Sequence, residues 1–315
     1  MKGTKVQALP RQSHLKATLR LMRRNWALYL LLLPTLVYIA TFHYAPMYGI
    51  QIAFRNFNFA DGISGSPWAG MKWFNFFFRS AKFWPVVRNT LVISFYSLIA
   101  SFPIPIILAL ILHNINSTKF KRTAQTITYL PHFISLVVVV GMLSSFTSIN
   151  SGWINTLIEF FGGERIFFMG IPEYYRHLYV WSGVWQEAGW GSIIYMAALT
   201  GIDPELHEAA TIDGATKLQR IFHIDLPGII PTIVIMLIMR CGSIMSVGFD
   251  KSYLMQNSLN MDVSEVISTY TYKMGLLDSK YSYSTAISLF NNVINFVFLT
   301  VVNRFAKLLS GNSLW

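Results

Sequence analysis

Two charged residues stand inside long apolar stretches of the sequence and could do chemistry there. Glu187 interrupts the stretch near 177–200, and Arg240 interrupts the stretch near 229–249. At about 1.5 Å per helical residue, both lie near the middle of a segment long enough to cross a bilayer. Because charges at that depth are costly and usually mark pathways or partners, we expect Glu187 and Arg240 to pair with each other or with a partner subunit beside a solute path. A structural pair without solute contact is an equal alternative.

Aromatic and amide side chains accompany these charges, and their combination is typical of a carbohydrate site. Rings pack on the apolar faces of sugars, while amides and carboxylates bond the hydroxyl groups. The candidate substrate-lining residues lie in the stretch that holds Glu187 and in the last apolar stretch: Trp185, Gln186, Trp190, Tyr195, Asn291, Asn292 and Asn295. For the asparagines, hydrogen bonding between helices is the stronger alternative.

We expect neither a catalytic site nor a metal site in this chain. Cys241 is the single cysteine, and no cysteine–histidine spacing is that of a zinc site. A serine protease would need more than the segment 189–192 (GWGS) and His132. The nearest approach to a phosphate-binding loop, 65–73 (GSPWAGMKW), has a displaced lysine and no hydroxyl for magnesium. ATP and Mg²⁺ are therefore expected on another chain, and no cofactor is expected on this one.

The most charged segment of the second half of the sequence, residues 203–227, lies between two apolar stretches. Asp203 can cap a helix that has a proline in its first turn and acidic residues near its start. Gly214 then interrupts with a bend that other residues resist. A second short helix follows and ends at Leu226 and Pro227, where the next span begins. The pattern predicts a helix–bend–helix that lies along the membrane surface.

This segment resembles the EAA signature of permease subunits in binding-protein-dependent ABC importers. The residues that match the signature are Glu208, Ala209, Ala210, Asp213, Gly214, Ala215, Phe222, Ile224, Leu226 and Pro227. Three other segments, 44–55, 65–70 and 240–249, are similar to the aldouronate and complex-oligosaccharide branch of that family.

The resemblance implies that the segment 203–227 docks into a cleft of a separate cytoplasmic ATPase. Glu208 would meet a basic group there, and Gly214 would shape the bend. The implied partners are a second permease subunit, expected to be a different chain, two ATP-binding subunits, and an external binding protein that delivers an oligosaccharide. A permease for another solute, such as a disaccharide or a glycerol phosphate, is the main alternative. An ion-driven secondary transporter or a scaffold would have no use for the docking segment.

The composition is that of a membrane protein, with 53% hydrophobic and 12% charged residues, against about 25% charged residues in a soluble domain. Six apolar stretches reach the length of about 20 residues that a spanning helix needs. They lie near 26–46, 89–113, 125–147, 177–200, 229–249 and 283–303. We therefore predict an all-α integral membrane protein with six transmembrane helices, the first of them uncleaved. The resemblance implies the ABC type I importer permease fold.

Basic residues before the first apolar stretch indicate the orientation of the chain. They are Lys2, Lys5, Arg11, Lys16, Arg20, Arg23 and Arg24, with no acidic residue among them. This bias predicts a cytoplasmic N-terminus in a multi-pass protein of the bacterial cytoplasmic membrane. Six spans would then place the C-terminus and the segment 203–227 in the cytoplasm. Because these seven basic residues lead directly into a span, the net charge of +11 indicates contact with membrane lipid, and we expect no nucleic-acid partner.

The expected organisation follows from these boundaries. It consists of a basic cytoplasmic segment (1–25), a first transmembrane helix (26–46), an external loop (47–88), a five-helix core (89–305) that includes the docking segment, and a cytoplasmic tail (306–315).

Overall fold

The computed structural model describes residues 18, 21–310 and 313–314. All regular secondary structure in this part is helical, apart from one isolated β-bridge between Arg55 and Trp68. The all-α prediction is therefore confirmed. Most of the basic residues that predicted the orientation (Lys2, Lys5, Arg11, Lys16 and Arg20) lie outside the described residues.

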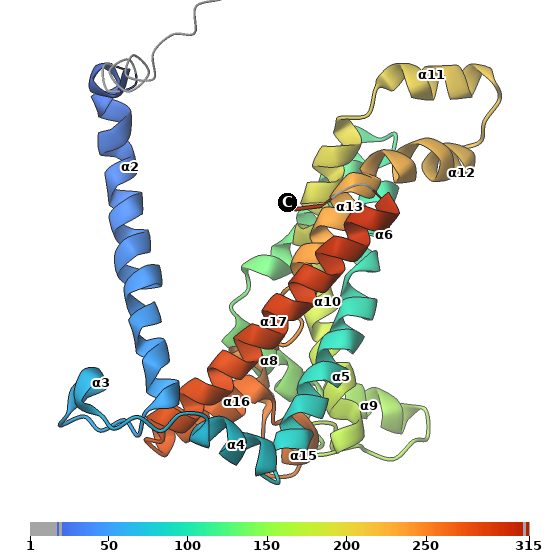
Figure 1. Cartoon of the computed structure of the whole chain (residues 1–315). Helices are drawn as coiled ribbons and strands as arrows, with labels where there is room; N and C mark the ends of the chain where they lie inside the picture. Colours follow the sequence, from blue (N-terminus) through green and yellow to red (C-terminus); the bar gives the residue numbers. More distant parts are fainter. Residues whose placement is uncertain (1–17, 19–20, 311–312, 315) are drawn as a thin grey trace, which may run out of the picture.

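The first helix stands apart from the rest of the chain (Figure 1). It runs from α2 (Trp26–Ile39) through η1 (Ala40–Tyr44) and η2 (Ala45–Phe54) as one apolar helix of 29 residues, longer than the predicted 26–46. No residue of α2 is buried, and only the η2 end packs against α17 (Tyr281–Ser310). The apolar surface of α2 is therefore free to contact lipid or another subunit.

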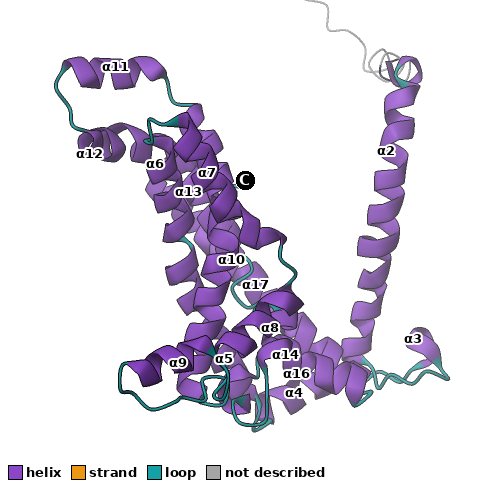
Figure 2. Ribbon diagram, turned by 180° about the vertical axis from the view of Figure 1, so that it is seen from behind, coloured by secondary structure: helices purple, strands orange, loops and turns teal. Residues whose placement is uncertain are grey.

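The other long helices form a bundle (Figures 1 and 2). α5 (Phe83–Ser101) continues into α6 (Pro103–His113), and both pack along α10 (Pro172–Thr200). α13 (Leu226–Cys241) packs against α10 and α17. Buried apolar side chains of α6, α10 and α13 make one of the cores, among them Ile106, Ala109, Leu112, Tyr195, Leu199 and Ile229.

The third predicted span is not one helix. α7 (Thr118–Tyr129) and η3 (Leu130–Phe133) meet α8 (Leu136–Phe146) at an angle of 97°. Pro131 opens the η3 turn, and the hydroxyl of Ser135 accepts a hydrogen bond from the Val138 amide at 3.4 Å as the N-cap of α8. The prediction of a single helix over 125–147 is therefore wrong, because a proline turn and a new N-cap stand in its middle.

The fifth predicted span begins earlier and ends sooner than expected. α12 (Lys217–Arg220), η4 (Ile221–Asp225) and α13 form one helix over 217–241, so the predicted end at Leu226 and Pro227 is wrong. The π-helical turn η4 leads directly into the first turn of α13, which contains Pro227. A proline is tolerated in a first helical turn, where its missing N–H group breaks no helical hydrogen bond. At the other end, the Asn295 side chain accepts the Met245 amide at 2.8 Å. The predicted residues 242–249 therefore do not extend the helix.

The prediction of six spans is confirmed in part. Four described helices are long and apolar enough to cross a membrane: 26–54, 83–113, 217–241 and 281–308. The bent pair α7–η3 and α8 makes a fifth when it is counted as one span. α10 has 29 residues and is long enough, but it carries more polar residues, and it buries Gln186 and Ser192 inside the bundle.

The shorter helices lie at the two ends of the bundle (Figure 1). α11 (Pro204–Ile212) and α12 lie at the end where α2 begins and α17 finishes. The opposite end holds α3 (Gly62–Gly65), α4 (Lys72–Arg79), α9 (Trp153–Phe160), α14 (Phe249–Met255), α15 (Met261–Ser264), α16 (Ile267–Tyr272) and η5 (Lys273–Leu277).

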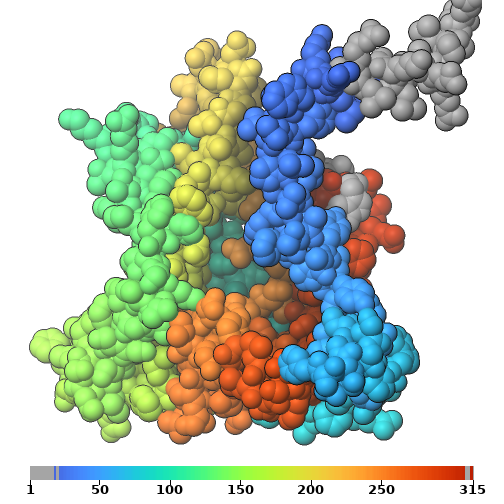
Figure 3. Space-filling view, turned by 90° about the vertical axis from the view of Figure 1, so that its left-hand side faces the viewer, coloured from blue at the N-terminus to red at the C-terminus, as the bar shows by residue number. Residues whose placement is uncertain are grey.

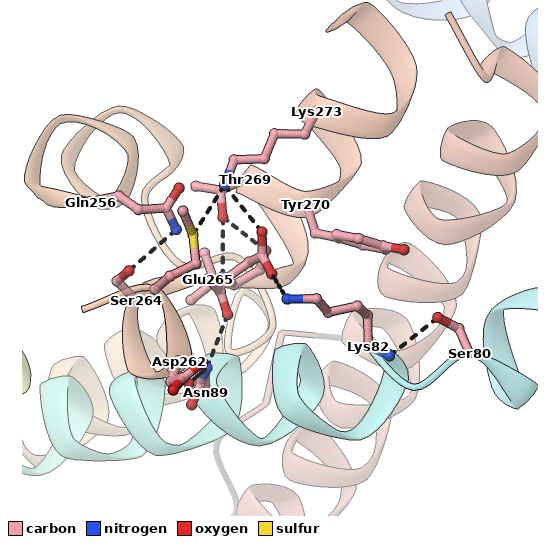
Figure 4. Close-up of polar contacts among 12 residues, drawn as sticks. Ser80, Lys82, Asn89, Gln256, Asp262, Ser264, Glu265, Thr269, Tyr270 and Lys273 are labelled. Carbon is pink, nitrogen blue, oxygen red and sulfur yellow. Dashed lines mark hydrogen bonds and ion pairs between the residues drawn. The ribbon is translucent and has the colours of Figure 1, made fainter. Parts of the chain in front are cut away.

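A charged cluster holds that opposite end together (Figure 4). Glu265, between α15 and α16, accepts Lys82 at 2.9 Å and Lys273 at 3.1 Å. Asn89 of α5 donates to the carbonyl oxygens of Asp262 and Glu265 at 2.7 and 3.1 Å. Burial by itself would raise the pKa of Glu265, but the hydrogen bonds and charges of the two lysines outweigh burial and hold this pKa below its ordinary value.

Candidate functional site

The predicted helix–bend–helix is present, and local contacts explain its shape. The Asp203 side chain accepts the Glu205 amide at 3.0 Å and caps α11. After α11, Gly214 adopts a φ of +75°, and the Ala215 amide donates to the Ala210 carbonyl at 2.9 Å. This left-handed residue closes the helix as glycine does in αL caps. The predicted cap and bend are both confirmed.

The second short helix is fixed to the first. Thr216 and Gln219 form a capping box at the start of α12, with the Thr216 amide 2.7 Å from the Gln219 side-chain oxygen. Arg220 donates to the Thr211 hydroxyl at 2.8 Å. These contacts hold the two helices of residues 203–227 together as one unit. We call it the docking segment after the role that the resemblance implies.

The docking segment exposes both its signature residues and an apolar surface. Glu208, Ala209, Asp213, Gly214, Phe222 and Pro227 are exposed, whereas Ala210, Ala215, Ile224 and Leu226 are half-buried. The large apolar side chains are strongly exposed: Leu206 by 53%, Ile212 by 87%, Leu218 by 66% and Phe222 by 61%. Sequence reasoning did not select Leu206 or Ile212 for docking, since their exposure depends on how the bend turns α11.

A cavity of about 310 Å³ lies within the bundle. α5, α10 and α13 line it, together with the chain that follows α13 as far as α14. Its polar lining consists of Gln186, Glu187, Arg240, Lys251, Tyr179 and five serines (Ser94, Ser97, Ser101, Ser243 and Ser246). Figure 3 shows a face of the molecule that is hollowed at mid-height. Three of the predicted site residues, Gln186, Glu187 and Arg240, thus share one cavity.

The predicted direct pair between Glu187 and Arg240 is not formed among the residues that the structure describes. The Glu187 carboxylate instead lies 3.0 Å from Nδ1 of His132, where the bend between α7 and α8 reaches α10. Trp190 stacks on the His132 ring with centroids 4.4 Å apart. His132 lies in η3, the turn at the break of the third span, and this turn packs against α10. Sequence reasoning had named His132 only for a protease.

The remaining candidate substrate-lining residues lie outside this cavity. Trp185 lines a separate apolar pocket with Trp181 and Phe168. Tyr195 is buried in the core of α6, α10 and α13. Asn295 of α17 bonds Met245 and Ser246, which lie in the non-helical chain that follows α13. Asn291 is half-buried and Asn292 is exposed, both on α17.

Lys251 is a cavity residue that sequence reasoning missed. It is buried, its ammonium group donates to the Tyr179 carbonyl at 2.8 Å, and the Tyr179 ring lies 4.9 Å away. Lys251 falls after the fifth apolar stretch, so the pattern of charges within spans did not point to it. Together with Arg240 it places two cationic side chains on the wall of the cavity.

Known proteins resemble this chain over most of its length. A permease for polygalacturonan and rhamnogalacturonan transport from Bacillus subtilis (strain 168), YteP, is 43% identical over 280 residues, which cover 89% of this chain and 87% of that protein. The protein LplB of the same organism is 42% identical over 287 residues, covering 91% and 90%.

Solved structures agree with these relatives. A chain from the crystal structure of a bacterial ABC transporter involved in the import of the acidic polysaccharide alginate superposes with a TM-score of 0.86. It is 38% identical, and the match covers 93% of this chain and 99% of that chain. A chain of the bacterial alginate transporter in complex with a periplasmic protein that carries an alginate pentasaccharide matches equally well.

A family model decides the classification. Residues 94–311 match the model for the inner membrane component of binding-protein-dependent transport systems. This region begins in α5 and includes the docking segment and every cavity residue except Ile93. The chain therefore belongs to the family of binding-protein-dependent transport system inner membrane components.

Proposed function

We propose that this chain is a membrane-spanning subunit of an ATP-driven importer in the bacterial cytoplasmic membrane. An external binding protein delivers an oligosaccharide to it, and the docking segment receives the force of nucleotide-driven closure from separate ATP-binding subunits. ATP and Mg²⁺ are bound by those subunits, and this chain supplies the path. A second permease subunit, expected to be a different chain, completes the path.

The apolar surface of the docking segment carries this proposal. Ile212 is 87% exposed on a segment that also carries the charged residues Glu205, Glu208 and Asp213. Large apolar side chains held outward on a shaped surface element mark a protein contact. Glu208 lies exposed on the same helix, where a basic group of a partner could reach it.

The arrangement of the ends supports the proposed topology of six spans with both termini in the cytoplasm. The start of α2, the end of α17 and the docking segment all lie at one end of the molecule (Figure 1). Arg23 and Arg24 lie just before α2, so two of the basic residues that predicted the orientation stand at that same end. A cytoplasmic ATPase would find the docking segment there.

The cavity supports an acidic oligosaccharide as the solute. Arg240 and Lys251 line it, and five serines supply hydroxyl groups for hydrogen bonds. Guanidinium and ammonium groups are suited to the carboxylates of uronic acids. The relatives named for polygalacturonan and for the acidic polysaccharide alginate agree in this chemistry.

An assembly experiment tests the docking surface. Ile212→Ser should weaken binding of the ATP-binding subunit by about 2 kcal/mol, or about 30-fold, because a buried apolar contact is lost. Phe161→Ser is the matched control, since Phe161 is 81% exposed near α9 at the opposite end. Copurification and coupled ATPase activity should fall only in the Ile212 variant. Unchanged copurification of the Ile212→Ser variant would contradict the proposal.

A substrate comparison tests the acidic class. In proteoliposomes that contain the assembled importer and its binding protein, Arg240→Gln should reduce uptake of an acidic uronate oligosaccharide. Uptake of a neutral oligosaccharide of equal length, delivered by the same binding protein, should change far less. Equal loss for both solutes would show that Arg240 is structural, and transport of neutral oligosaccharides alone would contradict the acidic class.

A further inference from the structure

Three potential metal ligands converge where the docking segment meets the bundle. His113 ends α6, His207 lies in α11, and Asp225 ends η4. One ligand atom from each residue lies within 4.8 Å of the other two. Residues that are far apart in the sequence, on three different elements, are thus gathered at one point.

Each of the three residues in this cluster has a buried side-chain atom that lacks a hydrogen bond. Nδ1 of His113, Nε2 of His207 and Oδ1 of Asp225 have no hydrogen-bond partner among the described residues. Asp225 is fully buried. A buried polar atom that is left unsatisfied destabilises the fold. Three such atoms at one place therefore require an explanation, and a shared ligand would supply it.

The geometry of His207 and Asp225 fits a metal ion that bridges the two side chains better than a hydrogen bond that joins them directly. Nε2 of His207 is 3.2 Å from Oδ1 of Asp225, and yet no hydrogen bond joins the two atoms. In a hydrogen bond, the N–H points at the oxygen. Two ligands of one ion instead point their lone pairs at a third position, and in a tetrahedral site they lie roughly 3.4 Å apart for bonds of about 2.0–2.1 Å.

A neighbouring amide holds the carboxylate in place. Asn114 Nδ2 donates to Oδ2 of Asp225 at 2.9 Å and to the Leu110 carbonyl at 3.0 Å. This contact occupies one carboxylate oxygen and turns the other, Oδ1, toward the histidines. Hydrogen bonds of this kind orient the ligands of metal sites. The His207 side chain is 24% exposed, so an ion can reach the cluster from solvent.

We propose that His113, His207 and Asp225 form a Zn²⁺ site. Two imidazole nitrogens, one carboxylate oxygen and a water molecule in the fourth position are a ligand set that suits zinc. The bound ion would cross-link α11 to the ends of α6 and η4. It would therefore hold the docking segment against the bundle, whatever solute the protein carries.

Direct zinc titration tests the site. The complete transporter complex, purified without a polyhistidine tag and stripped with a chelator, is titrated with Zn²⁺ against a chromogenic chelator. We expect one tight site for each copy of this chain. His207→Gln should weaken that site at least about 100-fold, because it removes a direct ligand. Co²⁺ should give the visible absorption of a tetrahedral site in the wild type and lose it in the variant.

Two further variants complete the design. His223→Gln is the matched control, because His223 is an exposed histidine of the same segment whose Nδ1 contacts the Gln219 carbonyl at 2.9 Å. It should bind zinc as the wild type does. Asp225→Asn keeps the shape of the side chain and should also lose the tight site. His207→Gln carries the test if the buried Asp225 variant fails to assemble.

Three results would overturn the proposal. One is the absence of a stoichiometric site in the wild type. Another is equal zinc affinity in the assembled wild type and the His207→Gln variant. The third is stability that depends on pH but does not respond to zinc, which would show that His207 and Asp225 form an ion pair only.

Discussion

The carboxylate of Glu187 lies 3.0 Å from Nδ1 of His132, and this contact joins α10 to the bend between α7 and α8. Arg240 lines the same cavity as Glu187 and forms no ion pair with any residue that the structure describes. The Glu187 carboxylate thus has a partner within the protein, while the Arg240 guanidinium is left to face the cavity. An acidic solute, as proposed above, would meet that cationic group in the cavity.

This relationship predicts which pairs of residues are coupled. In a double-mutant cycle on thermal inactivation of the purified complex, Glu187→Gln and His132→Gln should be non-additive by about 0.5–1 kcal/mol. The cycle with Glu187→Gln and Arg240→Gln is the control and should be additive. Coupling in the Arg240 cycle alone would restore the pairing that the sequence had suggested.

The bend of the docking segment depends on Gly214. Its φ is +75° and a Cβ would meet no atom within 4 Å, so Gly214→Ala adds backbone strain of about 1–2 kcal/mol without a clash. The strain should let α11 adopt other directions, and coupled ATPase activity should fall about fivefold.

Gly162 provides the control for this substitution. Its φ is +82° in open space beside α9, so Gly162→Ala adds the same strain at the other end of the bundle. ATPase activity of the reconstituted complex should be normal in that variant. A similar loss in both variants would indicate general destabilisation instead of a role for the bend.

The Glu265 cluster predicts loss of stability in acid. Because two lysines hold the pKa of Glu265 below its ordinary value of 4.5, its stabilisation is complete above that pH and declines as the pH falls through the lower folded value. The hydrogen bond to Glu265 raises the pKa of Lys82 above 10.5, although desolvation by itself would lower it. The contribution of the Lys82 charge to stability is therefore lost only as the pH rises through that higher value.

A Glu265→Gln variant checks this pH dependence. It should destabilise the complex by about 1–3 kcal/mol near neutral pH, because the carboxylate is nearly buried. Its melting temperature should then vary less between pH 6 and about pH 3.5 than that of the wild type. Glu159→Gln, which breaks an exposed ion pair to Arg165, should cost no more than about 1 kcal/mol. Equal effects of the two substitutions would contradict this account.

Close packing of α10 against α7 depends on Gly189. A Cβ at this position would overlap the carbonyl group of Thr128, whereas a Cβ at Gly141 in α8 would meet no atom within 4 Å. Gly189→Ala should therefore destabilise the complex by about 1–3 kcal/mol. Gly141→Ala should be neutral or slightly stabilising. Thermal inactivation of detergent-purified complexes measures both, and a neutral Gly189→Ala would show that the two helices can separate freely.

Local signals explain why the docking segment could be predicted. Asp203 caps its helix within two residues, and Gly214 ends that helix through bonds within one turn. Such contacts depend only on neighbours in the sequence. The end of the second helix could not be predicted in this way, because the π-helical turn before Pro227 lets the helix continue.

The sequence by itself determined the all-helical class, most of the apolar helices and the helix–bend–helix, because apolar length, caps and glycine act over a few residues. Only the tertiary structure decided which distant side chains meet. Glu187 contacts His132 across 55 residues, and Lys82 contacts Glu265 across 183. Those contacts depend on how each helix is rotated and where it breaks, above all on the 97° bend that brings His132 to α10. The apolar pattern of the sequence does not reveal this bend, because a bent span and a straight span of the same length can be equally apolar.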